Sequence, residues 1–490
     1  MYCGPSELIK EKIMQIKTIE EDDILRTSND ICIKRITKER SIVWNRFIPK
    51  IIFANNDTIK LLKLLENNNR KIKELSLLKK HLKKLFSHHL LLKSNSKSFR
   101  DLFIEDSVKM LNRVRISIYN KHKLKLPYTN LTFLNSKCNF KCNYCISKYV
   151  WKNIKNDLTT FEEKLKKIFK IIDKFFENNN VKTEKGIHFN GGEILLEFQI
   201  IKEIVKYIDL HHSSQKVHYS INTNGSLITK EIALFLKNYS FRVSISIDGY
   251  REFNNRTRRY KNNQGAFDDI IRGLELLNKY FPERIKSFQG TINDFDNLDF
   301  EKIYDMSKYG FQSARLGVNL LNLEVKSAKE FAKKHMELIL DSYDKPLIVN
   351  DDYLDYFKNA IKYNNIKFTF ACNGLTNIGN NILYYNLDKD SVHTICSFVY
   401  GTQVSMKEID NDIYNRLISD QCFNFIKNRI NQFFKICIDC EIVGACRGGC
   451  VTSGIDSFNN KNEAACAFKK EAWNIFLKYL YINKYSERIN

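Results

Sequence analysis

Residues 131–145 read LTFLNSKCNFKCNYC, an apolar stretch followed by three closely spaced cysteines. The apolar run predicts a strand, and the loop after it presents Cys138, Cys142 and Cys145. A cubane 4Fe-4S cluster held by thiolates normally takes four protein ligands, so three cysteines on one loop leave one iron open to a small molecule. A zinc knuckle is the simpler alternative. Structural zinc sites are four-coordinate, however, and no fourth Cys or His lies near this loop in the sequence.

The C-x3-C-x2-C spacing, with Tyr144 directly before the last cysteine, resembles the signature of radical S-adenosylmethionine (SAM) enzymes. In that family the amino and carboxylate groups of SAM chelate the open iron. The reduced cluster cleaves SAM to a 5′-deoxyadenosyl radical, which abstracts hydrogen from the substrate. The resemblance implies that Cys138, Cys142 and Cys145 are catalytic ligands of a SAM-binding 4Fe-4S cluster. It also implies an electron donor such as flavodoxin or ferredoxin.

The chain is long and strongly basic. Its 490 residues suggest about two to four domains, at about 100 to 200 residues per domain. The formal net charge of +23 could indicate a nucleic-acid partner. Lysine is spread along the whole length and forms no single basic arm, so we expect solvated faces rather than nucleic-acid binding. Part of the charge could steer an acidic peptide.

Cysteine usage and the lack of apolar segments indicate the compartment. The 13 cysteines are an odd number, and most lie in short-spaced clusters, which indicates metal binding rather than disulfides. No run of about 18 or more apolar residues occurs, and residues 1–15 contain no apolar signal core. We therefore expect a soluble, cytoplasmic protein with no membrane partner.

After the first cysteine motif, apolar strands and amphipathic helices alternate, which predicts parallel βα units in an α/β fold. Six units follow one another, the number in the radical SAM barrel, so we predict a partial (β/α)6 TIM-like barrel over residues 125–345. In α/β barrels the chemistry lies on the loops after the strands. The expected strands are 131–134, 186–190, 216–225, 242–249, 285–292 and 313–320, and the expected helices are 161–176, 198–210, 230–238, 266–280, 300–308 and 328–341.

Three of these loops resemble SAM-binding motifs of the family. Asn190-Gly191-Gly192-Glu193 resembles the GGE motif, whose backbone and acid hold the amino group of SAM and whose glycines let the ligand come close. Ile194 replaces the proline that often follows. The other two are the TNG-like sequence 222–225 and the S-x-D-G-like sequence 246–249.

Downstream, one arginine matches a residue that commonly reaches the SAM carboxylate, and Ser246 would contact the methionyl or ribose part of SAM. Arg258 fits that arginine position, with Arg256 and Arg259 as alternatives. The resemblance thus implies these SAM-binding residues: Tyr144, Gly191, Gly192, Glu193, Asn222, Asn224, Ser246, Asp248 and Arg258.

Residues 1–100 predict a small α+β domain of their own. Strands are expected at 31–37, 41–47 and 50–54, and helices at 57–69 and 72–92. This order resembles the winged-helix precursor-recognition element of enzymes that modify ribosomally made peptides. The resemblance implies that a leader peptide adds a strand at the sheet edge. A DNA-binding winged helix and a structural cap are the alternatives. Residues 101–124 are expected to form a linker helix.

The C-terminal region, residues 346–490, is rich in cysteine. Residues 437–450 read CIDCEIVGACRGGC, and further cysteines lie before and after this stretch. The pattern resembles the SPASM domain, which binds two auxiliary iron-sulfur clusters in radical SAM maturases of peptides and proteins. The resemblance implies one cluster on Cys437, Cys440, Cys446 and Cys466, and a second on Cys372, Cys396 and Cys450. Without the barrel, such pairs would equally suit zinc.

The region departs from the family pattern at several positions. Ser391 stands where glycine is usual, Ile378 lies near the position of a further cysteine of sulfatase maturases, and Ser397 replaces their basic aspartate. The first auxiliary cluster could therefore keep an iron open to substrate, unless Cys422 closes it. Cys422 could equally be a core thiol.

The resemblance covers roughly residues 125–480 and implies a radical SAM maturase of a ribosomally made peptide. Thioether crosslinking of the sactipeptide type is the preferred chemistry, because an open auxiliary iron would suit a cysteine thiolate. Carbon–carbon crosslinking, epimerisation and sulfatase maturation are alternatives, the last disfavoured by Ser397. Outside the enzymes, an iron-sulfur winged-helix regulator that binds nucleic acid and a zinc-stapled scaffold remain open. The peptide and the bond formed are not specified by the sequence.

Overall fold

The computed structural model describes most of the barrel and parts of the two flanking regions. The described residues are 24–67, 70–71, 79–102, 104–105, 129–145, 160–177, 184–283, 287–320, 323–362, 382–388, 391–393, 404–405, 420–446, 448, 455–456, 460–461 and 463–486. Most of the expected linker helix lies outside these residues.

A large sheet forms the centre of the molecule. Its strand order is β13-β12-β11-β10-β9-β8-β7-β14-β15-β16, and the eight strands from β13 to β14 are all parallel to their neighbours. The strands are β7 (Asn130–Asn135), β8 (Lys185–Gly191), β9 (Val217–Thr223), β10 (Arg242–Ser246), β11 (Ser287–Ile292), β12 (Ser313–Val318), β13 (Ile348–Asn350), β14 (Ile382–Asn386), β15 (Ser391–His393) and β16 (Val404–Ser405).

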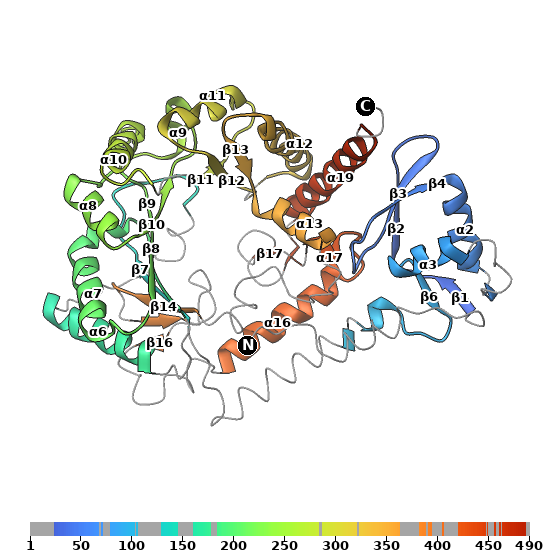
Figure 1. The fold of residues 1–490 in the computed structure, drawn as a ribbon, viewed down its shortest axis with the longest axis horizontal. Helices are drawn as coiled ribbons and strands as arrows, with labels where there is room; N and C mark the ends of the chain where they lie inside the picture. Colours follow the sequence, from blue (N-terminus) through green and yellow to red (C-terminus); the bar gives the residue numbers. More distant parts are fainter. Residues whose placement is uncertain are drawn as a thin grey trace.

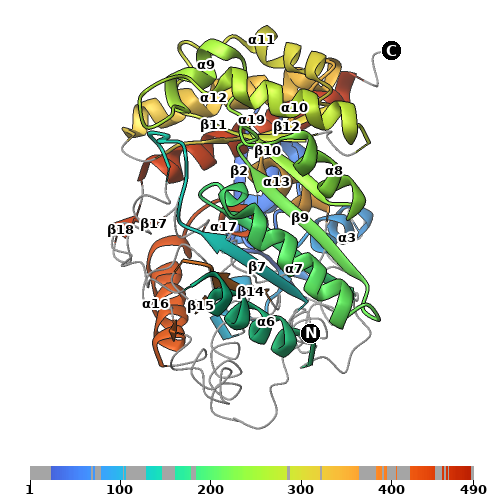
Figure 2. The ribbon, with the colours of Figure 1, turned by 90° about the vertical axis from the view of Figure 1, so that its left-hand side faces the viewer.

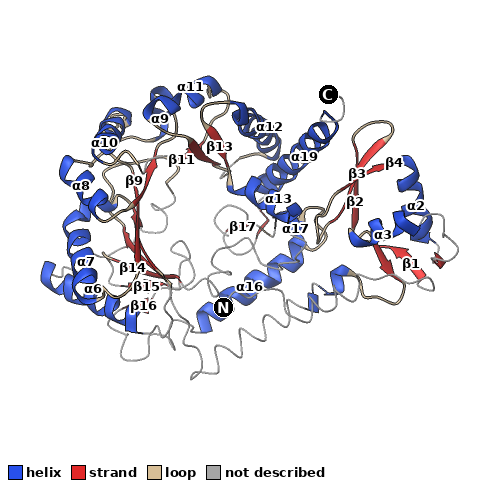
Figure 3. Cartoon of the chain, in the orientation of Figure 1, coloured by secondary structure: helices blue, strands red, loops and turns tan. Residues whose placement is uncertain are grey.

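Helices cover the outer face of this sheet, which curves into an arc with the strands on the inside (Figures 1 and 3). In the side view, β7 and β9 run obliquely beneath α7 (Figure 2). The helices are α6 (Phe161–Glu177), α7 (Phe198–His211), α8 (Lys230–Asn238), α9 (Arg251–Thr257), α10 (Phe267–Tyr280), α11 (Phe300–Tyr304), α12 (Val325–Asp341) and α13 (Asp352–Lys362), with short 3-10 helices at Ile194–Glu197, Asp305–Tyr309 and Ser342–Asp344.

Alternation along the strands produces the two faces of the sheet. In β8, Ile187 and Phe189 are buried in the large core, whereas Asn190 lines a cavity on the other face. Similarly, Ile221 of β9 is in the core and Asn222 lines the cavity. Successive side chains of a strand point to opposite faces, so the apolar set packs under the helices and the polar set faces the inside of the arc.

The six expected strands and their helices are all present, and the sheet extends beyond them on both edges. The sequence analysis ended the barrel at residue 345, but β13 pairs with β12, and β14 pairs with β7. Both added strands come from the region assigned to the C-terminal extension. β14 is only five residues long and pairs with β7, which lies about 250 residues earlier in the chain, so no local pattern could identify its partner.

The N-terminal module, residues 24–105 as described, contains two small antiparallel sheets. One has the order β2-β3-β4 and the other β5-β1-β6. Its own core contains Leu25, Val43, Leu62, Leu82 and Leu85. The elements are β1 (Ile24–Thr27), β2 (Ile31–Arg35), β3 (Arg40–Asn45), β4 (Ile52–Asn55), α2 (Asn56–Asn67), β5 (Arg70–Lys71), α3 (Lys79–Ser87) and β6 (Leu91–Lys93).

The three strands expected in this module are present, but the prediction of one helix over 72–92 was wrong at its end. The helix α3 ends at Ser87, and His89 has a φ of 59°. A residue in the left-handed region stops a helix. The following leucines then pair with β1 as strand β6, because their burial between α3 and β1 outweighs their helical propensity.

The C-terminal region packs between the barrel and the N-terminal module. Its elements are α16 (Asp420–Cys437), α17 (Val443–Cys446), β17 (Ile455–Asp456), β18 (Asn460–Lys461) and α19 (Glu463–Ser486). Helix α19 lies along α12 of the barrel (Figure 1). Among the described helices, none is long and apolar enough to span a membrane.

A partly buried histidine contacts the strands on both sides of it on the inner face. His188 of β8 bonds through Nε2 to Asn130 Oδ1 at 2.9 Å, and its Nδ1 contacts Ser220 Oγ. These partners suit the neutral ring, with Nε2 donating and Nδ1 accepting. Burial, with a contribution from the positive charge of Arg242, lowers the pKa of His188 below its ordinary value.

We predict that the protein loses stability as the pH falls from about 7.5 to about 5.5. The unfolded histidine takes up a proton below about pH 6.5, whereas folded His188 resists it, so the folding free energy is lost in that range. The substitution His188→Gln should reduce this pH-dependent loss in anaerobic thermal unfolding. His211→Gln, at an exposed position on α7, is the control and should keep the wild-type pH dependence. Equal pH dependence in His188→Gln and wild type would contradict the prediction.

Candidate active site

A cavity of about 940 Å³ lies at the carboxyl ends of β7, β8, β9 and β10. This volume is in the range of small-molecule sites. Most of the residues expected to bind a cluster and SAM line it, namely Cys138, Cys142, Tyr144, Cys145, Gly191, Gly192, Asn222, Asn224, Ser246 and Arg258. The structure thus brings together loops that are more than 100 residues apart in the sequence.

The cysteine loop is held by backbone contacts with the segment after α9. Lys141 N donates to Arg259 O at 2.6 Å, and Asn143 N donates to Thr257 O at 3.3 Å. The ring of Phe140 packs edge-on against Tyr260, with centroids 4.8 Å apart. The shape of the loop is therefore set by a neighbour from the fourth βα unit.

Two glycines bring the loop after β8 directly against the cysteine loop. Gly191 has a φ of 132°, and a Cβ there would lie 2.3 Å from Asn135 O. A Cβ on Gly192 would lie 2.2 Å from Lys137 O. Any side chain would push the two loops apart, so both positions require glycine.

Glu193 lies beneath this surface and is not among the residues that line the cavity. Its side chain is fully buried and accepts hydrogen bonds from Leu195 N at 3.0 Å, Thr223 Oγ1 at 2.7 Å and Asn224 N at 2.7 Å. Burial raises the pKa of Glu193, against the lowering effect of these three hydrogen bonds. Its carboxylate thus links the loops after β8 and β9, and the expected contact of this acid with SAM stays a prediction.

Asp248 is the second buried carboxylate under the cavity. It accepts from Tyr144 Oη at 2.8 Å, from Thr257 Oγ1 at 2.7 Å and from Thr291 N at 2.9 Å. Arg258 Nε lies 3.0 Å from its Oδ1. Like Glu193, Asp248 is not among the residues that line the cavity, and its contacts hold Tyr144 and Arg258 at the cavity wall.

The ion pair and the ring of Tyr144 determine the charge state of Arg258. Burial alone would lower the pKa of Arg258, but the Asp248 carboxylate raises it above its ordinary value, so the guanidinium stays charged. Its centre lies 5.7 Å from the Tyr144 ring. Burial and the nearby Asp248 raise the pKa of Tyr144 well above its ordinary value, which keeps the phenol protonated as a donor.

Of the three arginines proposed for the SAM carboxylate, only Arg258 lines the cavity. Arg256 pairs with Asp294 at 3.7 Å, and Arg259 Nε donates to Asn255 O at 2.7 Å. Of the three alternatives, Arg258 is therefore the arginine that faces the cavity.

Two residues that the sequence analysis did not single out also shape the site. Asn139, within the cysteine motif, accepts from Asn224 Nδ2 at 2.9 Å and donates to Ser226 Oγ at 2.9 Å. Asp388, after β14, accepts from both N and Oγ of Ser136 at 2.6 Å. Asn139 could have been found from its place inside the motif, whereas Asp388 has no local signal.

The residues around the cavity fit a thiolate-held cluster with SAM beside it. The three cysteine thiols line the cavity together with Gly191 and Gly192, whose bare backbone a ligand could approach closely. The charged guanidinium of Arg258 lines the same cavity. Burial raises the pKa of Cys138 to about 12, with smaller contributions from Glu193 and the other two thiols. A bound metal deprotonates a coordinating thiol and so offsets this cost. In the described part of the chain, no three Cys, His, Asp or Glu residues converge as ligands of a single metal ion would.

The second set of expected cluster ligands is only partly described. Cys437 ends α16, Cys440 and Cys446 follow within ten residues, and Cys466 lies on α19. Cys372, Cys396 and Cys450 lie outside the described residues, as do Ile378 and Ser397. Cys422 lies in α16, and Ser391 begins β15.

We predict that Glu193→Gln lowers the free energy of unfolding by about 1–3 kcal/mol, because the amide NH₂ cannot accept and leaves at least one buried donor unpaired. Denaturant unfolding under anaerobic conditions measures the change. Glu203→Gln makes the same replacement on the solvent side of α7 and should change stability by less than about 0.5 kcal/mol. If the two variants unfold alike, Glu193 does not hold the loops together.

Comparisons with known proteins agree with this geometry. Residues 133–307 match the Radical SAM superfamily. The chain is 27% identical over 362 residues to the radical SAM cyclopropyl synthase TigE of Paramaledivibacter caminithermalis, covering 69% of this chain and 71% of that protein. It is 25% identical over 342 residues to the cysteine-type anaerobic sulfatase-maturating enzyme of Clostridium novyi, covering 66% and 88%.

Among solved structures, anSMEcpe with bound AdoMet has the same fold, with a TM-score of 0.57 and 21% identity, over 74% of this chain and 100% of that one. The family match starts within β7 and includes the cysteine loop and the loops after β8, β9 and β10. These are the segments that meet around the cavity. Residues 133–307 of this chain therefore carry a domain that matches the Radical SAM superfamily, and the chain is similar in sequence to a radical SAM cyclopropyl synthase and to anaerobic sulfatase-maturating enzymes.

Proposed function

We propose that the protein is a radical SAM maturase that modifies a ribosomally made peptide. The observation that carries the proposal is the single cavity in which the three cysteines of the first motif meet the loops after β8, β9 and β10. The sequence relatives support a peptide or protein substrate, because they include enzymes named as sulfatase-maturating. A structure of the same fold is described as binding a Cp18Cys peptide together with AdoMet.

In this proposal, Cys138, Cys142 and Cys145 hold a 4Fe-4S cluster. When bound and reduced, the cluster supplies the electron that cleaves SAM to a 5′-deoxyadenosyl radical, which abstracts hydrogen from the peptide. Gly191 and Gly192 offer a bare backbone to the amino group of SAM, and Arg258 pairs with its carboxylate.

Asn222, Asn224 and Ser246 supply polar groups at the carboxyl ends of β9 and β10 for the remaining polar parts of SAM. Glu193 and Asp248 act from below by keeping the loops and the Arg258 guanidinium in place. This proposal divides the chain into a recognition module (1–100), a linker (101–124), the barrel (125–345) and the auxiliary-cluster region (346–490). The strands β13 and β14 of the last region belong to the barrel sheet.

The finer proposal is a thioether bond between a cysteine sulfur and a carbon of the peptide. Each such bond removes two hydrogens, one taken by the radical and one lost as a proton and an electron. The auxiliary clusters on the C-terminal cysteines would accept that electron. Carbon–carbon crosslinking differs in the bond formed but shares the same first step, so the test below addresses the shared step.

We predict that the reduced protein forms 5′-deoxyadenosine from SAM under anaerobic conditions. The triple substitution of Cys138, Cys142 and Cys145 by Ala should abolish the product, because these are the three proposed protein ligands of the SAM-binding cluster. Cys3→Ala, outside every proposed cluster, is the control.

Wild-type protein that forms no 5′-deoxyadenosine but binds DNA with a strong salt dependence would favour the nucleic-acid regulator instead. Fewer than about eight irons per chain would contradict the multi-cluster proposal.

The N-terminal module offers an edge strand for a leader peptide. Among the described strands, β2 pairs only with β3. Arg46 N donates to Asp30 O, and Ile36 N donates to Arg40 O, which places the even-numbered residues of β2 in the hydrogen-bonded pairs. The N–H and C=O of Ile33 therefore point to the open edge, and its side chain is 43% exposed.

We predict that Ile33→Pro weakens binding of a leader peptide at least tenfold, since it removes an outward N–H that an added strand needs while the ladder with β3 keeps its bonds. Ile33→Ala keeps the N–H and is the matched control for the lost side chain. Fluorescence anisotropy with a labelled precursor peptide from a neighbouring open reading frame measures the effect. Equal binding by the two variants would place the leader elsewhere.

A further inference from the structure

The central strand of the N-terminal module is buried on both faces. Val43 of β3 packs in the core of the module itself, whereas Ile42 and Trp44 belong to the large core shared by the barrel and the C-terminal region. The ring of Trp44 meets that of Trp473 on α19 at 6.2 Å, nearly edge-on. The module is thus packed into the rest of the molecule.

The same strand reaches the loop that carries the C-terminal cysteines. Trp44 Nε1 donates to Glu441 O at 3.0 Å, and Cys32 Sγ donates to the same carbonyl at 3.8 Å. In the other direction, Gly444 N donates to Arg46 O at 2.8 Å. These contacts engage the peptide groups between Cys440 and Cys446, so they act on the loop backbone.

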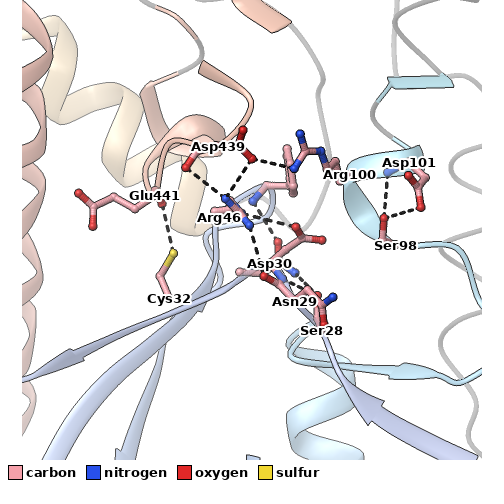
Figure 4. A network of polar contacts seen from close by, with 12 residues as sticks. Ser28, Asn29, Asp30, Cys32, Arg46, Ser98, Arg100, Asp101, Asp439 and Glu441 are labelled. Atoms are coloured by element: carbon pink, nitrogen blue, oxygen red, sulfur yellow. Dashed lines mark hydrogen bonds and ion pairs between the residues drawn. The ribbon is translucent and has the colours of Figure 1, made fainter. Parts of the chain in front are cut away.

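Charged groups surround these backbone contacts (Figure 4). Arg46 Nη1 donates to Asp439 O at 3.1 Å, and its Nε lies 3.5 Å from the buried carboxylate of Asp30. Arg100 pairs with the Asp439 carboxylate at 2.7 Å. The side chain of Asp439 is 65% exposed, so this pair adds little energy. The orienting contact is the Arg46 bond to the Asp439 carbonyl, one residue before Cys440.

Gly444 shows how closely the two backbones approach. A Cβ at this position would lie 2.4 Å from Phe47 O and 2.7 Å from Arg46 O. Both atoms are backbone carbonyls of the module, which cannot move aside as a flexible side chain could. The loop between Cys440 and Cys446 therefore keeps its path only because residue 444 has no side chain.

The cysteines of this loop lie close to one another. Helix α19 approaches the same loop, since Lys470 Nζ lies 3.5 Å from the Glu441 carboxylate. Cys440 N donates to Cys437 O at 2.9 Å, and Cys446 N donates to Ile442 O at 2.7 Å. Cys437, Cys440 and Cys446 lie on one short stretch and Cys466 on α19, and their four thiols are the donor type that an iron-sulfur cluster requires.

We propose that the N-terminal module is a structural part of this auxiliary cluster site. Trp44, Arg46 and Cys32 are positioning residues that hold the peptide groups around Cys440 in the shape that ligation requires. The inference rests on the proposed cluster at Cys437, Cys440, Cys446 and Cys466. Groups outside the ligand set commonly govern metal affinity, and here they come from the domain proposed to recognise the peptide. Module docking and cluster binding are then thermodynamically linked, each strengthening the other by the same factor.

The first test measures iron retention in the full-length chain with Cys138, Cys142 and Cys145 replaced by Ala, so that the remaining iron is on the C-terminal cysteines. In this background Gly444→Ala should lower the chelator concentration that removes half of the auxiliary iron about 10- to 100-fold. Gly317→Ala is the matched control, because a Cβ at that position of β12 meets no atom within 4 Å. Equal retention in the two variants would overturn the inference.

A second variant keeps the inference testable if Gly444→Ala misfolds. Trp44→Phe keeps an aromatic ring in the core and removes only the donor to Glu441 O, so it should weaken iron retention in the same direction with native circular dichroism. It should also alter the electron paramagnetic resonance spectrum of the reduced auxiliary cluster. A background protein that binds no iron would instead refute the proposed auxiliary cluster, which separates the two failures.

The reciprocal test measures how loss of the auxiliary cluster affects the N-terminal module. Removal of a ligand by Cys440→Ser should speed amide hydrogen exchange in residues 41–47 relative to the wild type, because the loss of the cluster weakens the docking of the module. The exchange of β11, on the far part of the sheet, is the internal control and should not change. Unchanged exchange of residues 41–47 in an iron-depleted variant would show that the module does not sense the cluster and would overturn the inference.

Discussion

The parallel pairing of β7 with β8 on one side and β14 on the other is the constraint on which the site depends. Parallel neighbours end at the same edge of a sheet, so the loops after these strands begin side by side. Asn135 at the end of β7 then bonds to Gly192 N and Glu193 O, and Asp388 after β14 bonds to Ser136. The cysteine loop is therefore held from both flanks before any ligand arrives.

Two buried carboxylates connect the cysteine loop and the loop after β8 to the other segments around the cavity. Glu193 joins the loop after β8 to that after β9, and Asp248 joins Tyr144 and Arg258 to the backbone at Thr291. A buried charge is tolerated only where several donors converge on it. Glu193 and Asp248 thus hold the loops together from within, and the cavity above them is lined by cysteines, glycine backbone, amide and hydroxyl side chains, Arg258 and three lysines.

The three regions of the chain are less separate in space than along the sequence. The C-terminal region gives β13 and β14 to the barrel sheet, and α19 lies against α12. The N-terminal module completes the packing with Trp44 against Trp473 and with Phe53 against Tyr481. The three regions therefore share packed contacts in the described part of the chain.

By itself, the sequence determined the βα alternation and the cavity residues of the radical SAM domain, because strand and helix periodicities are local and the motif residues are contiguous. Cys138, Gly191, Asn222 and Ser246 could be placed from motifs at the ends of predicted strands that resemble those of a known family. Tertiary structure decided that Glu193 and Asp248 point inward, that Arg258 rather than Arg256 or Arg259 reaches the cavity, and that residues 91–93 form a strand. It also decided the contacts of Asp388 with Ser136 and of Gly444 with Arg46. Such contacts join residues hundreds of positions apart, and only the packing of the whole chain determines which of them meet.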